Sequence, residues 1–254
     1  MRDGLPGTQI YHVLEDRNGY LWVNSNEGVS RFDGRQFINY GINEGVPCIS
    51  SNICFQDSQL RLWVCTRSGM AQFKNERFVS YPTSDNQSNL YVFGMRETKE
   101  KKLWALTGAG TYEFTGTQWK KITLYPGFEN IQCRNIIEKD GSIYVNYGSA
   151  IAYKPKNQPW TLLTTNQKYG SLFNKMELYE NEIWASTRDN IFKITNNQLN
   201  PLYKEGFIPK GYFDYFVDSH HRLWLAGNGY LKVSKAGDWN SFTKEGDQYH
   251  YSSV

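Results

Sequence analysis

Side chains that could carry out catalysis are scarce in this chain of 254 residues and do not form the patterns that enzymes use. Of the four histidines, His220 and His221 are adjacent in a predicted tight turn, and His12 is expected on a strand. Glu15 and Asp16 form a carboxylate pair, but neighbouring strand residues point to opposite faces of a sheet. Asp16 also opens a predicted turn, where its carboxylate is expected to bind nearby backbone amides. The sequence contains no Walker, HExxH, GxSxG or EF-hand motif, so it assigns no catalytic or metal-binding residue and no cofactor.

Polar and aromatic residues suited to ligand binding fall between the predicted strands. Amides, carboxylates and Arg forks can pair with sugar hydroxyls or acidic groups, and aromatic rings can cover the apolar face of a sugar. The shorter connections contribute Asn26, Glu27, Arg67, Arg188, Asp189 and Asn228. The longer ones contribute Tyr91, Tyr125, Phe128, Tyr169, Phe207 and Tyr212. These residues form the candidate ligand-binding set, and the alternative is that they are ordinary polar and aromatic residues of loops.

A repeat of about 40 residues positions these connections. Its marker is an aromatic residue preceded by Leu or Ile, found at Trp22, Trp63, Trp104, Tyr144, Trp184 and Trp224. A fixed period of this length is typical of solenoids and propellers. Helical arrays are disfavoured because Gly recurs often and a 3.6-residue apolar period is missing. Since a lone four-stranded sheet buries too little apolar surface, the tryptophans are expected to pack between neighbouring repeats.

The first repeat predicts four strands. Apolar or alternating runs cover residues 10–14, 20–23, 29–32 and 36–40, with turn signals at 16–19, 26–28 and 33–34. The expected fold class is therefore all-β, a single β-propeller domain of six four-stranded antiparallel blades. The approximate blades are 8–42, 49–83, 89–124, 130–164, 171–203 and 211–243, and residues 244–254 resemble the start of a following repeat. We expect the chain to be a segment of a longer, seven-bladed propeller, and a ring closed by six blades is the alternative.

Propeller geometry predicts where the candidate residues meet. The connection between the second and third strands of a blade lies at the same end as the connection from the fourth strand to the next blade. The candidate set falls on these two kinds of connection. It is therefore expected on one face, around the mouth of the central channel.

Charge and cysteine content limit which partners, disulfides and metal sites the sequence predicts. The formal net charge is +3, from 28 basic and 25 acidic residues that are interspersed. No strong electrostatic field therefore favours binding to nucleic acid or to an anionic membrane. No run of 18 apolar residues is present to cross a membrane. Four cysteines are too few and too irregular for a disulfide scaffold or a CxxC metal site. A hairpin turning at residues 58–61 would place Cys54 opposite Cys65, where a cross-strand disulfide is a hypothesis.

The segment from Glu15 to Gly34, preceded by Gly4, Leu5 and Pro6, resembles the two-component regulator propeller repeat. The later repeats match it more loosely, mainly through the Leu or Ile before Trp or Tyr. In that family the repeats form the extracytoplasmic sensor of histidine kinases and hybrid two-component systems. They precede an immunoglobulin-like module, a membrane span and cytoplasmic kinase and regulator domains.

The resemblance implies a periplasmic ligand-sensing domain, often for carbohydrate, that relays its signal to kinase domains absent from this chain. Its expected partners are a small-molecule or oligosaccharide ligand and, in the full-length sensor, a second copy. The membrane is reached only through other parts of the parent, and this segment is expected to be non-catalytic. Two alternatives stay open. They are a propeller enzyme of the polysaccharide lyase or hydrolase type, and a propeller for protein interaction or dimerisation.

Overall fold

The computed structural model describes residues 4–179, 181–188, 190–201, 213–218, 220, 222–227, 230–235 and 238–241. The chain divides into two compact units, unit 1 (Met1–Arg134) and unit 2 (Asn135–Val254). Each unit contains strands and almost no helix. Among the described residues, no helix has the length and apolar character needed to span a bilayer.

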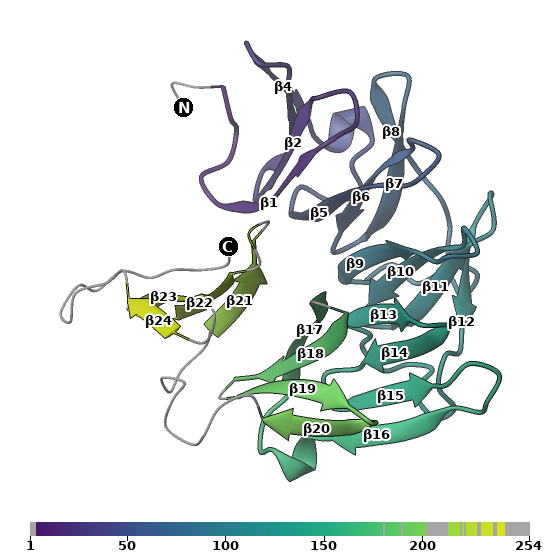
Figure 1. Ribbon diagram of the computed structural model, residues 1–254. Coiled ribbons are helices and arrows are strands. Elements are labelled where there is room, and N and C mark those ends of the chain that lie inside the picture. The colour runs from purple at the N-terminus through teal and green to yellow at the C-terminus, as the bar shows by residue number, and fades with distance from the viewer. Residues whose placement is uncertain are drawn as a thin grey trace. The chain divides into compact units, whose positions relative to one another are not determined.

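Unit 1 contains three four-stranded sheets (Figure 1). The first comprises β1 (Ile10–Glu15), β2 (Leu21–Ser25), β3 (Gly28–Phe32) and β4 (Phe37–Tyr40). The second comprises β5 (Ser51–Gln56), β6 (Leu62–Thr66), β7 (Gly69–Lys74) and β8 (Arg77–Ser80). The third comprises β9 (Val92–Glu97), β10 (Leu103–Thr107), β11 (Gly110–Phe114) and β12 (Trp119–Ile122). A 3-10 helix, η1 (Ile42–Glu44), lies between the first two sheets in the chain.

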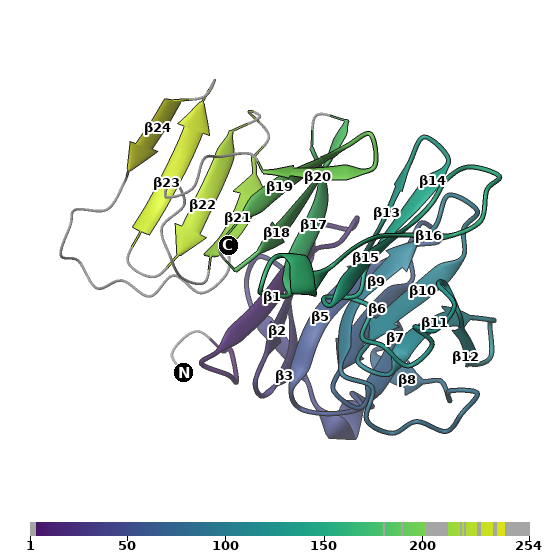
Figure 2. The ribbon, with the colours of Figure 1, turned by 90° about the horizontal axis from the view of Figure 1, so that it is seen from below.

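Unit 2 contains three more sheets of the same kind (Figure 2). Its first sheet comprises β13 (Asn135–Lys139), β14 (Ser142–Asn146), β15 (Ala150–Lys154) and β16 (Thr161–Thr165). After η2 (Asn166–Lys168) come β17 (Phe173–Tyr179), β18 (Glu182–Thr187), β19 (Ile191–Thr195) and β20 (Gln198–Pro201). The last sheet comprises β21 (Phe213–Val217), β22 (Leu223–Gly227), β23 (Tyr230–Lys235) and β24 (Asp238–Ser241).

Every sheet is an antiparallel meander whose strands follow chain order. The marker aromatic occupies the same position in each, on the second strand; Trp22, for example, lies opposite Leu14 on one side and Arg31 on the other. The described strands therefore confirm the all-β fold class and its four-stranded blades. The period of the sequence is the period of the blades.

Two of the marker tryptophans, Trp22 and Trp63, pack between neighbouring blades, as predicted. Trp22 of the first blade contacts Phe73 and Phe78 of the second, with ring centroids 4.9 and 6.2 Å apart. Trp63 of the second blade contacts Phe114 and Trp119 of the third, at 4.8 and 5.4 Å. Edge-to-face pairs of this kind stabilise beyond the area that they bury. The core of unit 1 is thus a series of aromatic layers between blades.

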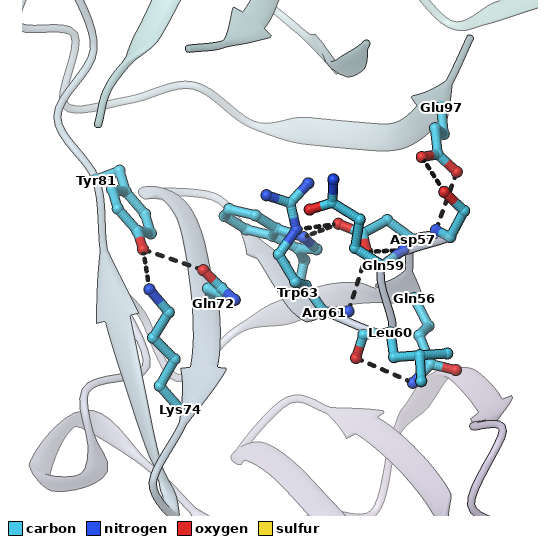
Figure 3. Close-up of polar contacts among 11 residues, drawn as sticks. Gln56, Asp57, Gln59, Leu60, Arg61, Trp63, Gln72, Lys74, Tyr81 and Glu97 are labelled. Atoms are coloured by element: carbon cyan, nitrogen blue, oxygen red, sulfur yellow. Dashed lines mark hydrogen bonds and ion pairs between the residues drawn. The ribbon is translucent and has the colours of Figure 1, made fainter. Parts of the chain in front are cut away.

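The turn between the first two strands of a blade is built around a buried carboxylate. Asp57 is 1% exposed, and its Oδ1 accepts the backbone N–H groups of Gln59 and Arg61, each at 3.0 Å. Its Oδ2 accepts Nε of Arg61 at 2.6 Å and the indole N–H of Trp63 at 3.0 Å (Figure 3). One side chain therefore fixes both the turn and the rotamer of the core tryptophan.

The same turn recurs in other blades. Asp16 accepts the backbone N–H groups of Asn18 and Tyr20 and the indole N–H of Trp22, as expected for a turn-opening Asp. In the last blade Asp218 accepts the indole N–H of Trp224 at 2.8 Å. In these three blades the Asp lies six residues before the Trp, so the indole N–H reaches its carboxylate. The third blade has Thr98 at this position, and its hydroxyl accepts the backbone N–H of Lys102.

The predicted disulfide between Cys54 and Cys65 is wrong, because both residues are free thiols. The backbone N–H of Asp57 bonds to the carbonyl of Arg61, so the turn spans 57–61 rather than 58–61. This one-residue change places Val64 opposite Cys54 and Ile53 opposite Cys65. A shift of one residue sends a side chain to the other face of a sheet. Accordingly, Cys54 lies in the core shared with the first blade and Cys65 in the core shared with the third.

Candidate functional site

A cavity of about 230 Å³ lies in unit 1, where the predicted kinds of connection meet. Its lining residues come from β1, from the segment between β4 and β5, from the β6–β7 turn, and from the start of β9 with the residue before it. They are Tyr11, Ser50, Arg67, Tyr91, Val92 and Phe93. Arg67 and Tyr91 belong to the candidate set predicted from the sequence, and the structure brings them together.

Backbone geometry holds Arg67 and Tyr91 side by side. The backbone carbonyl of Arg67 accepts the N–H groups of Leu90 and Tyr91, at 3.1 and 3.0 Å, so the two connections are joined. Tyr91 has a φ of +43°, a conformation that non-glycine residues seldom adopt. The guanidinium carbon of Arg67 lies 5.2 Å from the centroid of the Tyr91 ring. This distance is within the range of a cation–π contact.

The aromatic wall of the cavity continues past Tyr91. The rings of Tyr91 and Phe93 have centroids 4.8 Å apart, with an interplanar angle of 45°. Tyr11 lies 45% exposed on β1, and its hydroxyl donates a hydrogen bond of 3.3 Å to Oε1 of Gln9. The cavity therefore combines apolar ring surface with one cation.

The Arg67 side chain is exposed and has no acidic partner among the residues that the structure describes. Two other arginines of unit 1 have acidic partners. Arg31 pairs with Glu76 at 3.0 Å and Arg61 pairs with Asp57 at 2.6 Å. An unpaired guanidinium beside an aromatic wall is chemically suited to hold an anionic group.

Asn26 and Glu27 lie on the β2–β3 turn but do not line this cavity. The Asn26 Oδ1 accepts the backbone N–H of Gln9 at 3.2 Å, and its Nδ2 donates to Glu27 Oε1 at 3.4 Å. Both side chains are thus engaged near the N-terminal segment. Tyr125 and Phe128 form a ring pair with centroids 5.3 Å apart in the segment between β12 and β13, and neither lines the cavity.

Two candidates of unit 2, Tyr169 and Arg188, lie among the described residues. Tyr169 packs against Phe192 and Phe173, with centroids 4.7 and 5.7 Å away, and joins the core of that unit. Its ring is therefore engaged in packing between blades. Arg188 is exposed directly after β18. The remaining candidates lie outside the described residues; they are Asp189, Phe207, Tyr212 and Asn228.

Four lining residues were not predicted from the sequence: Tyr11, Ser50, Val92 and Phe93. A signal for two of them exists in the repeat. Tyr11 and Phe93 each lie four residues before the last residue of the first strand of a blade, at Glu15 and Glu97. An aromatic residue at the same position of two blades could have marked an inner surface. Ser50 carries no comparable signal.

The two histidines that the structure describes among those singled out from the sequence are His12 and His220. His12 is half-buried on β1, and burial lowers the pKa of its imidazole. His220 is exposed in the turn before β22, where its backbone N–H donates to Asp218 Oδ1 at 2.9 Å. His221 lies outside the described residues. Neither His12 nor His220 lines the cavity.

Comparison with known proteins relates both the sequence and the fold to other proteins. Residues 4–27 match the family model described as two component regulator propeller. Comparison with curated proteins gives no match. The extracellular domain of a hybrid two component system from B. thetaiotaomicron has a TM-score of 0.77 and 15% identity, covering 99% of this chain and 37% of its own.

Two further solved structures share the fold. The extracellular domain of a one component system from B. thetaiotaomicron has a TM-score of 0.72 and 16% identity, covering 96% of this chain and 37% of its own. Virginiamycin B lyase from Staphylococcus aureus has a TM-score of 0.71 and 12% identity, covering 94% of this chain and 85% of its own.

At these identities the likeness shows the fold alone. This chain spans 37% of the length of the two B. thetaiotaomicron domains. The sequence match is independent of the fold likeness, and it falls on the segment that includes the Asp16 turn and Trp22. The chain is therefore a β-propeller protein whose residues 4–27 match the two component regulator propeller model.

Proposed function

We propose that this chain is an extracytoplasmic ligand-sensing domain of a bacterial two-component sensor, and that it binds a small solute in the unit 1 cavity. The observation that carries the proposal is the coincidence of two features. Residues 4–27 match the two component regulator propeller family, and the predicted candidates Arg67 and Tyr91 meet in a cavity. Loops held by a rigid scaffold are where binding residues concentrate in proteins.

In the parent protein, ligand capture would favour one arrangement of the sensor over another, because a ligand shifts an equilibrium only by its difference in affinity for the two states. A kinase domain and a dimeric parent belong to this proposal, as does a periplasmic location. Carbohydrates are included among the solutes to be tested, since aromatic walls with polar groups suit them.

A thermal-shift screen against oligosaccharides and small organic solutes tests the proposal. A ligand that binds only the folded chain raises the melting temperature by mass action. At a ligand concentration of 100 times Kd, the free energy of unfolding increases by about 2.7 kcal/mol. We expect at least one solute to raise the melting temperature of the wild-type chain and to lose this effect in Tyr91→Ala.

Arg188→Ala is the matched control. Arg188 directly follows β18 as Arg67 directly follows β6, but it belongs to unit 2. Its replacement should leave the shift unchanged. A screen in which no solute changes the melting temperature, or in which Arg188→Ala weakens the shift as much as Tyr91→Ala, would refute the proposed site.

A propeller enzyme is the second candidate, because virginiamycin B lyase has the same fold. Fold likeness does not carry chemistry from one protein to another. Incubation of each screening hit with the chain, followed by mass spectrometry of the solute, separates the two candidates. Unchanged solute supports the sensor, and conversion of the solute supports the enzyme.

A further inference from the structure

The charge of the unit 1 cavity defines the kind of group that it can hold. Arg67 is its one charged lining residue, and no described carboxylate neutralises it. The guanidinium has a fixed fork of donors that matches a carboxylate with two parallel hydrogen bonds. A single cation balances a single negative charge. A monocarboxylate therefore fits the site better than a dianionic phosphate, which needs more donors.

The aromatic lining residues indicate which ligand scaffold can carry this carboxylate. Tyr91 and Phe93 present adjacent ring surfaces, and Tyr11 adds a third ring. Rings of this kind pack against flat apolar faces. Ser50 and Tyr11, which also line the cavity, carry hydroxyl groups. The volume of about 230 Å³ lies below the range of about 300–1,000 Å³ for drug-sized ligands, so a small ligand built on one ring suits it.

We infer that the cavity binds a monocarboxylate carried on a single six-membered ring, with the carboxylate on Arg67 and the ring against Tyr91 and Phe93. This inference rests on the proposed function and specifies its ligand. Both a sugar acid and an aromatic acid have this chemistry. Glucuronate and benzoate are therefore the two probes, and glucose and benzamide are their neutral counterparts.

Isothermal titration calorimetry of the chain with the four probes tests the inference. At least one acid should bind about tenfold or more tightly than its neutral counterpart, a preference that corresponds to about 1.4 kcal/mol. The identity of that acid shows which source the site selects. The preference should decrease as salt is raised, because an exposed ion pair is screened.

Arg67→Gln should remove the preference for the acid while leaving the melting temperature of the free chain unchanged, because its side chain is exposed. Arg188→Gln should change neither quantity. Arg67→Lys keeps the charge without the fork, so an intermediate affinity is expected.

Other outcomes overturn the inference in distinguishable ways. If the neutral probes bind as well as the acids and only Tyr91→Ala removes binding, the carboxylate assignment is wrong and the sensor site stands. If no acid binds, or if Arg188→Gln weakens binding as much as Arg67→Gln, the inference is wrong. The proposed function is then judged by the wider solute screen.

Discussion

Replacement of Asp57 by Ala is the strongest single test of how the blades are held. The buried carboxylate accepts four hydrogen bonds, two from backbone N–H groups and two from the side chains of Arg61 and Trp63. Alanine removes every one of these acceptors at once. The indole N–H of Trp63 and the guanidinium of Arg61 are then left without their partner inside a packed turn.

The magnitude follows from burial. Breaking a buried ion pair by removing one partner costs about 3–5 kcal/mol. The Arg61 side chain is 26% exposed whereas that of Asp57 is fully buried, so water can partly solvate the orphaned guanidinium. We therefore expect the lower part of the range, about 3 kcal/mol of unfolding free energy. A loss of this size is a large share of the stability of a typical domain.

Urea unfolding followed by tryptophan fluorescence measures the loss. The matched control is Asp33→Ala, because Asp33 also accepts two backbone N–H groups in a turn, from Arg35 and Gln36, but is exposed. Water replaces its carboxylate, so a much smaller loss is expected. An Asp57→Ala protein that is no less stable than Asp33→Ala, at an unchanged urea dependence, would falsify the role assigned to this carboxylate.

Three further predictions concern pH, thiols and backbone space. Burial lowers the pKa of His12 below 6.5, so the unfolded chain takes up a proton at a higher pH than the folded chain does. The free energy of unfolding should therefore fall as the pH falls from 6.5 toward the folded-state pKa. The urea midpoints measured at pH 7.5 and pH 5.5 should differ less in His12→Gln than in the wild-type chain. Burial raises the pKa of Cys54 to about 12, so a thiol reagent should react first with half-buried Cys48 in the native chain, and with all four thiols after unfolding without reductant. Gly45→Ala would place Cβ 2.0 Å from a backbone carbonyl oxygen, whereas the Cβ of Gly34→Ala, at a similar positive φ, meets nothing within 4 Å. Gly45→Ala should therefore lower the free energy of unfolding more than Gly34→Ala does, and equal values for the two variants would contradict this geometry.

The blades could be predicted because their signals are local. Each repeat carries its own turn residues and its own alternation, and Trp22 and Trp63 mark the same register in two sheets. The position of Cys54 could not be predicted equally well. It depends on whether a turn begins at residue 57 or 58, and a hydrogen bond from the backbone of Asp57 decides this. Propensity does not distinguish turns that differ by one residue.

The candidate site was predicted in part for a different reason. Arg67 and Tyr91 follow from the rule that two kinds of connection meet at one end of the blades. Tyr169 obeys the same rule, yet its ring packs against Phe192 within the core of unit 2. A loop aromatic can turn toward the core or toward solvent, and only the surrounding volume selects between them. Nothing in the local sequence encodes that volume.

The two ends of a blade carry different constraints, and this limits what the family signature can reveal. At the end with the first turn, Asp16 and Asp57 make the same indole contact, and Thr98 of the third blade still accepts a backbone N–H of its turn, from Lys102. At the opposite end, the first position after the second strand is Asn26, Arg67 and Gly108 in successive blades, an amide, a guanidinium and no side chain. The first end keeps a side chain that accepts a backbone N–H of the turn in these blades, whereas the other end changes its chemistry from blade to blade. Ligand chemistry in such a propeller therefore has to be determined from the variable end, blade by blade.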